Sequence, residues 1–160
     1  TYHECDVNDA QDIKRLLPEN AVVVSSTPFT TTKSTALLAA LREAGIKRLL
    51  RVGGAGSLLL TNDTRLVDSP EFPEEYKAEA LAGCKCLELL RSQPELNWTF
   101  LSPAEIFEPG ERTGKFRLGR DQLLFDRNGK SWISMQDYAI AMVDEIELDQ
   151  HSRQRFTVGY

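Results

Sequence analysis

The chain has 160 residues, of which 41% are hydrophobic and 27% charged, and its formal net charge at pH 7 is −5. This balance predicts one globular domain over residues 1–160. The negative charge argues against non-specific nucleic-acid binding, which relies on a basic surface. No apolar run approaches the ~18 residues of a membrane span, so no membrane association is expected.

Helical and strand patterns alternate along the first half of the chain. Helical spacing of apolar residues marks the helices, and short apolar runs mark the strands. The expected elements are a helix capped by Asp9 and ended by Pro18, a strand at Val22–Val24, a helix ended by Gly45, a strand at Arg48–Val52 and a loop over 57–72.

The second half continues the alternation around a polar, turn-rich stretch. The long helix that follows the loop carries a stripe of Tyr76, Ala80, Cys84 and Leu87. The expected elements are this helix opened by Pro73, a strand at Asn97–Leu101, short strands at Phe116–Leu118 and Leu123–Phe125, a helix opened by the capping box Ser134–Asp137, and a strand at Arg155–Tyr160.

Three apolar runs each end in a cluster of small residues. Val22–Val24 is followed by Ser25, Ser26 and Thr27, the run ending at Val52 by Gly53 and Gly54, and the run ending at Leu101 by Ser102, Pro103 and Ala104. The order predicts an α/β fold with a doubly wound parallel sheet. Val22–Val24, the most apolar strand, is expected at its centre. Ligands bind outside the carboxyl ends of such strands, so the small residues predict a dinucleotide-type site.

Four segments carry a resemblance to a known family: Cys5–Asp9, Gly45–Ser57, Leu89–Ser92 with Asn97–Pro103, and Ile133–Ser134 with Asp137–Ala139. Their order and spacing resemble atypical short-chain dehydrogenases with an NAD(P)-binding Rossmann fold, the group of NADH-flavin reductases related to NmrA-like and biliverdin-reductase-B-like proteins. The resemblance implies NAD or NADP as cofactor, without choosing between them, and a flavin as a possible substrate.

The resemblance also implies roles for particular residues. The segment from Glu105 to Glu111 would approach a substrate. The implied cofactor contacts are Asp6 and Val7 beside the adenine, Ser25, Ser26 and Thr27 at the ribose and phosphates, Gly53 and Gly54 beside the nicotinamide, and Pro103 and Ala104 under its ring.

The chain departs from the family pattern in two places. The family opens with a strand and a glycine-rich turn that seats the pyrophosphate, and nothing before Asp6 supplies them. We therefore expect the family's first strand, helix and second strand to be missing, leaving an edge beside Val22–Val24 for an upstream segment or a second copy of the chain. The family's Tyr-x-x-x-Lys pair is also absent, since Ala80 stands four residues after Tyr76.

Candidate catalytic residues have alternative structural explanations. Ser57 can bond a carboxamide or a substrate oxygen, or cap a loop. Tyr76 can line a substrate pocket, but its place in a helical stripe favours core packing. His3 and His151 have no ligand-type neighbours at metal-binding spacing, so we expect surface positions and no metal. The acidic residues from Glu71 to Glu79 are expected to be solvated.

The three cysteines, Cys5, Cys84 and Cys86, are too few and too unevenly placed for a disulfide scaffold and predict buried thiols in a reducing, cytoplasmic protein. Two functions remain open. One is hydride transfer from NAD(P)H to a small flavin- or quinone-like acceptor, which needs no dedicated proton donor. The other is a non-catalytic NAD(P)-sensing module of the NmrA type, or a remnant that binds no cofactor.

Overall fold

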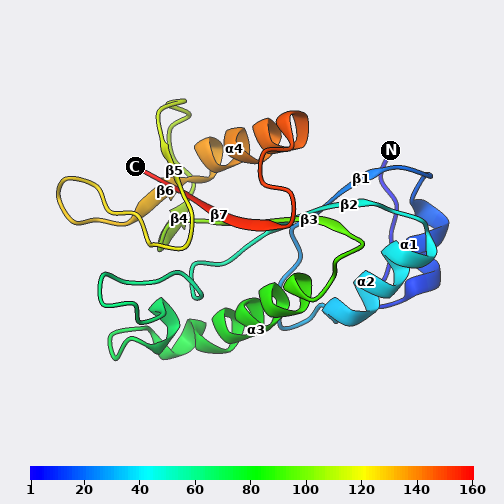
Figure 1. Ribbon diagram of the computed structural model, residues 1–160, viewed down its shortest axis with the longest axis horizontal. Helices are drawn as coiled ribbons and strands as arrows, with labels where there is room; N and C mark the ends of the chain where they lie inside the picture. Colours follow the sequence, from blue (N-terminus) through cyan, green and yellow to red (C-terminus); the bar gives the residue numbers. More distant parts are fainter.

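The central sheet has five strands in the order β1-β2-β3-β7-β5 and is parallel except for its last strand (Figure 1). The computed structural model describes all of residues 1–160. The strands are β1 (Val22–Ser25), β2 (Arg48–Val52), β3 (Asn97–Ser102), β7 (Gln154–Gly159) and the antiparallel β5 (Arg117–Gly119). The predicted doubly wound α/β fold is confirmed.

Four α-helices and one 3-10 turn connect the strands. Asp9 caps the first helix by accepting from the N–H groups of Gln11 and Asp12, and Ser134 caps the last by accepting from Asp137. None of the helices combines the length and apolar character that a membrane crossing requires. The helices are α1 (Ala10–Leu16), α2 (Ser34–Glu43), α3 (Glu74–Arg91) and α4 (Met135–Leu148), with the 3-10 helix η1 at Leu66–Asp68.

Alternate residues of the strands form two cores, one on each face of the sheet. Leu49 and Phe100 pack against α2 and α3, whereas Leu50 and Leu101 pack against α4 with Phe156 of β7. Figure 1 shows α3 and α4 on opposite faces. Because both faces of β2 and β3 are covered, their carboxyl ends are fixed between two packed layers.

The position predicted for Val22–Val24 is wrong. β1 pairs only with β2 and forms an edge of the sheet. Val23 packs against the α2 and α3 core, but Val22 and Val24, which point to the other face, are 49% and 44% exposed. An apolar run shows that a strand can bury its side chains, but it does not show how many strands pair with it. In β1, one edge has no partner strand and the face with Val22 and Val24 is exposed.

Two further differences lie in the turn-rich stretch. Leu123–Phe125 is not a strand, because only Gln122 forms an isolated bridge, to Leu59, while Leu123 packs with Leu58 and Leu66. Two short strands that the sequence did not predict, β4 (Ile106–Glu108) and β6 (Trp132–Ser134), form a separate parallel pair. Three-residue strands are too short for their alternation to stand out from turn residues.

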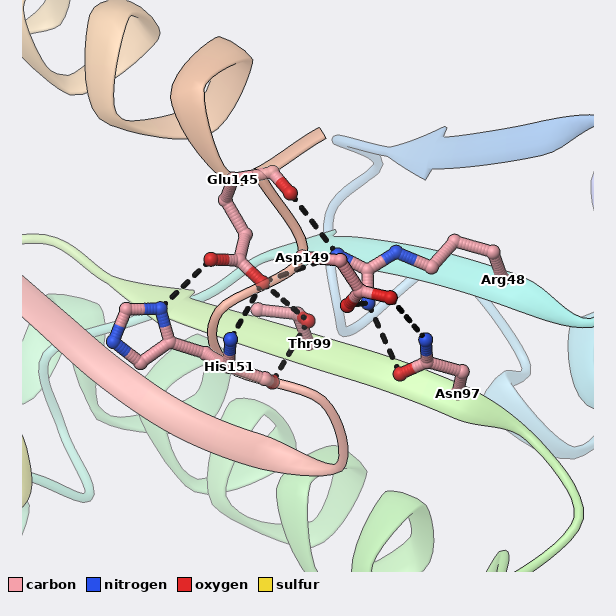
Figure 2. Close-up of polar contacts among 6 residues, drawn as sticks. All are labelled: Arg48, Asn97, Thr99, Glu145, Asp149 and His151. Carbon is pink, nitrogen blue, oxygen red and sulfur yellow. Dashed lines mark hydrogen bonds and ion pairs between the residues drawn. The ribbon is translucent and has the colours of Figure 1, made fainter. Parts of the chain in front are cut away.

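A buried carboxylate fixes the last turn of α4 to the amino-terminal ends of strands β2 and β3 (Figure 2). Glu145, 3% exposed, accepts from Arg48 of β2 at 3.1 Å and from the His151 backbone N–H at 2.9 Å. The His151 ring nitrogen Nδ1 lies 2.7 Å from Glu145, and the ring stacks on Phe156 at 3.9 Å. The surface position predicted for His151 is therefore wrong, since its side chain is only 21% exposed.

The same cluster extends along the starts of β2 and β3. Arg48 also pairs with Asp149, and Asn97 donates to Asp149 at 2.9 Å. Thr99 donates to the His151 carbonyl at 3.0 Å. These contacts hold the turn between α4 and β7, and with it the register of β7 against β3.

Glu145 makes the fold sensitive to acid. Burial by itself raises the pKa of Glu145, but the hydrogen bonds from His151 and Arg48 outweigh it and hold the pKa below its usual range. A carboxyl whose pKa is lower in the folded chain contributes stability above its unfolded pKa of about 4.3, and that stability is lost as the pH falls through the folded value.

Glu145→Gln should therefore lower the free energy of unfolding by about 3 kcal/mol at pH 7, because Arg48 and His151 lose their charged partner. The difference from wild type should shrink between pH 5 and pH 3, in urea denaturation series. Glu147→Gln, on an exposed position of the same helix, is the control for the charge change. If the free energies of unfolding of wild type and E145Q change with pH in parallel, Glu145 is not the source of the acid sensitivity.

The open edge should make the chain prone to association through β1, because an exposed apolar edge strand is a template for pairing. Val24→Lys should slow aggregation on heating, measured by light scattering, since a charged side chain on an edge strand opposes strand addition. Val143→Lys, which replaces a valine 49% exposed on α4, is the matched control. Equal effects of the two substitutions would show that net charge alone is responsible.

Candidate functional site

A cavity of about 340 Å³ lies at the carboxyl end of the parallel strands. Its volume is at the lower end of the range for small-ligand pockets. Two depressions of about 360 and 350 Å³ lie elsewhere, against α4 and beside the turn before β3, away from the strand ends. The cavity is lined by Phe29, Gly54, Ala55, Gly56, Leu66, Phe72, Pro73, Tyr76, Glu79, Ala80, Glu105 and Ile106.

The glycines after β2 bring three elements close together. A Cβ on Gly53 would lie 2.4 Å from the Phe100 ring and 2.6 Å from the Leu101 carbonyl, and one on Gly56 would lie 2.9 Å from the Cβ of Ala80. A Cβ on Gly54 would meet only Phe29, at 3.7 Å. Gly53 and Gly56 therefore serve packing, whereas Gly54 presents bare backbone to the cavity.

Glu79 of α3 holds the loop that follows β1. Its carboxylate accepts from the backbone N–H of Phe29 at 2.5 Å, and from the N–H and hydroxyl of Thr30 at 2.9 and 2.7 Å. Burial raises the pKa of Glu79, but these hydrogen bonds outweigh it and lower the pKa below its usual value. The solvated position predicted for Glu79 is wrong, because it anchors this wall of the cavity.

Arg51 of β2 also holds this loop, through hydrogen bonds to backbone carbonyls at the end of β1 and just after it. Its guanidinium donates to the carbonyls of Ser25 at 2.9 Å and Thr27 at 2.6 Å, and its Cζ lies 4.1 Å from the centre of the Phe29 ring. Burial lowers the pKa of Arg51. In the sequence, Arg51 lies within an apolar run, which predicts a strand and no role for this residue. A charged residue inside a run buried on both faces was the signal that could have found it.

The residues predicted at the phosphate side lie at the carboxyl end of β1, and those predicted at the adenine side lie beside the loop that follows it. Ser25 is buried, Ser26 is exposed and Thr27 is half-buried. The turn that contains Asp6 and Val7 docks on the following loop through Asn8, which donates to the Thr31 carbonyl at 3.1 Å and accepts from the Lys33 N–H at 2.7 Å. The turn with Asp6 and Val7 thus lies beside the loop that follows β1, and the contacts of all five residues with a cofactor stay predictions.

The residues predicted around the nicotinamide do not lie together in the structure. Pro103 and Ala104 are buried, Ala104 within the α4 core, and neither lines the cavity. Ser57 accepts from Arg155 at 3.1 Å and lines a separate depression, a contact that favours its structural explanation. The roles of these three residues stay predictions.

Tyr76 lies on the wall of the cavity and not in the core. It is 61% exposed, whereas Cys84 and Leu87 of the same stripe are buried. The stripe leaves the core because the first turns of α3 extend beyond the sheet. Core packing is therefore the wrong explanation for Tyr76, and its catalytic role stays a prediction.

The NAD(P)H-binding family matches this sequence over residues 1–148. The chain belongs to the NAD(P)H-binding family. It is also similar to the uncharacterized protein YwnB of Bacillus subtilis strain 168, with 47% identity over 126 residues. That match covers 77% of the chain and 59% of YwnB, so it spans less than two thirds of this relative.

Solved structures of other bacterial proteins share the fold closely. A proposed epimerase from Bacteroides thetaiotaomicron is 37% identical with a TM-score of 0.90, over 98% of the chain and 74% of the epimerase. A proposed NADH-flavin reductase from Streptococcus pneumoniae is 37% identical with a TM-score of 0.79, over 96% of the chain and 77% of the reductase. The predicted Rossmann-type family is confirmed.

The two adjacent glycines should respond differently to a methyl group. Gly53→Ala should lower the free energy of unfolding by about 1–3 kcal/mol, because its Cβ meets a ring and a backbone carbonyl that are both fixed. Gly54→Ala should change it by less than about 0.5 kcal/mol. Urea denaturation of the two variants measures the difference, and equal losses would contradict the assignment of Gly54 to the cavity wall.

Proposed function

We propose that the chain is an NAD(P)H-dependent reductase that transfers a hydride to a small flavin- or quinone-like acceptor. The observation that carries the proposal is the aromatic-lined cavity at the carboxyl end of the sheet, with bare backbone at Gly54, in a chain of the NAD(P)H-binding family. The relationship to the Streptococcus pneumoniae protein supports a flavin-type acceptor.

The chain fits a nicotinamide cofactor at one end of the sheet. Gly54 leaves space that a Cβ would fill, and Ser25, Ser26 and Thr27 stand at the neighbouring strand end. Arg51 and Glu79 hold the loop after β1 in one conformation before any ligand arrives. These residues would receive the cofactor, and neither NAD nor NADP is favoured by them.

The chemistry requires little of the protein beyond orientation. A bound NAD(P)H supplies a hydride, and the acceptor takes it up with one proton from water, giving NAD(P)⁺ and the two-electron-reduced acceptor. The aromatic side chains Phe29, Phe72 and Tyr76 can align a flat ring and exclude water from its faces. Tyr76 carries the only hydroxyl among the lining side chains, and no lysine lines the cavity to assist it. An acceptor that needs no dedicated proton donor suits this arrangement.

Two measurements test the function. NADPH and NADH are titrated against the protein by nicotinamide fluorescence, and then oxidation of the bound nucleotide is followed with menadione or riboflavin as acceptor. Binding with oxidation supports the reductase. Binding without oxidation by any acceptor would instead support an NAD(P)-sensing protein, and absence of binding would refute both.

Gly54→Val should weaken NADPH binding at least tenfold, because the branched side chain occupies the space over the bare backbone. Circular dichroism and the thermal midpoint should stay near the wild-type values, since only Phe29 lies within reach of the new Cβ. Val52→Ile, a change of one methylene just before the glycines, controls for added volume. Unchanged affinity of a folded G54V protein would remove Gly54 from the binding site.

A further inference from the structure

The charged groups in the cavity lining are all acidic. Two of the twelve lining residues are carboxylates, Glu79 and Glu105, and none is lysine, arginine or histidine. The Glu79 carboxylate is held in its charged form by the loop that it anchors. Glu105 is exposed, and its backbone N–H, not its side chain, donates to Ser131 at 3.2 Å. A ligand in the cavity therefore faces negative charge.

Nearby positive charge is already satisfied by other groups. The amino end of α3, whose helix dipole favours anions, adjoins the cavity at Pro73, but Glu74 and Glu75 occupy its first turn and offset that field. The Arg51 guanidinium is buried, and its N–H groups donate to backbone carbonyls of the loop after β1. Neither feature leaves a free partner for an anionic ligand.

The cavity is also small and aromatic. Its volume of about 340 Å³ accommodates a ring system and leaves little room for a long substituent. The exposed lining residues, Pro73, Tyr76, Glu105 and Ile106, mark the side of the cavity that is open to solvent, so a phosphate or sulfonate on the ring system would remain there, near the Glu105 carboxylate.

We propose that the acceptor is an uncharged flat ring system, a quinone or a flavin without a phosphate, and that Glu105 discriminates against anionic acceptors. This inference rests on the reductase function proposed above. If the phosphate lies roughly 8 Å from the carboxylate in a water-like dielectric, Coulomb's law for two negative charges against one gives about a fivefold loss of affinity. The effect is screened by salt, because both groups are exposed.

Riboflavin and FMN test the proposal because they share one ring system and differ by a phosphate. Quenching of flavin fluorescence gives the Kd of each without any nicotinamide cofactor. FMN should bind about fivefold more weakly at low ionic strength, and the ratio of the two Kd values should approach one as salt is added. Glu105→Gln should reduce the ratio at least twofold. Glu147→Gln, which removes the same charge from an exposed position of α4 outside the lining, should leave the ratio unchanged.

A second pair of acceptors separates this proposal from the function on which it rests. Turnover of NADPH is compared with menadione and with a sulfonated naphthoquinone, and the uncharged quinone should give the higher kcat/KM. Absence of turnover with both quinones and with riboflavin refutes the reductase, while the flavin Kd ratio still decides the charge preference. Equal Kd values for the two flavins, a ratio insensitive to E105Q, or no binding of either flavin would overturn the proposal.

Discussion

The candidate site depends on one buried cation. Arg51 lies inside the sheet layer, where an uncompensated guanidinium would be strongly unfavourable. Its N–H groups are satisfied by carbonyls of the loop after β1, and its flat face is covered by Phe29. The requirement to satisfy this charge leaves that loop few alternative conformations. Because Phe29 is then also fixed, the wall that it forms against Gly54 and α3 is part of the folded core.

The two ends of the sheet have different roles: groups at the amino end stabilise the fold, and groups at the carboxyl end form the candidate binding site. At the amino end, the Glu145 cluster joins α4, β2 and β3 through buried charges and a stacked histidine. At the carboxyl end, Gly54 keeps its backbone accessible, and Arg51 and Glu79 hold the loop that forms one wall of the cavity. Loss of a buried ion pair at one end therefore acts on the whole fold, whereas a side chain added at Gly54 acts locally.

Local patterns in the sequence predicted most of the elements. The caps at Asp9 and Ser134 and the apolar runs of β1, β2 and β3 are signals contained within a few residues, and each proved correct. The same runs predicted a site at the strand ends, where the cavity lies, but of the predicted cofactor residues only Gly54 lines that cavity, and the site itself stays a prediction. The apolar run of β1 wrongly predicted a central strand, because hydrophobicity reports the capacity of a strand for burial and not the number of its neighbours; the open edge was expected only from the family pattern. Contacts between residues distant in sequence were not predicted, because they depend on tertiary packing and leave no periodic pattern in the sequence. These contacts are Arg51 with Phe29, Glu79 with Thr30, and Glu145 with Arg48.

The course of α3 has a consequence for how the cavity adapts to its contents. The helix is continuous from Glu74 to Arg91, so Tyr76 and Ala80 belong to the same rod as Leu87 and Leu90, which are buried in the core. Tyr76 cannot move outward as a backbone unit unless those core residues move as well. The opposite wall, at Glu105 and Ile106, belongs to a short segment before a two-stranded ribbon. The helix thus fixes one side of the cavity, and the N–H groups of Glu105 and Ile106 hold the facing segment to Ser131, so the width of the cavity is set before a ligand binds.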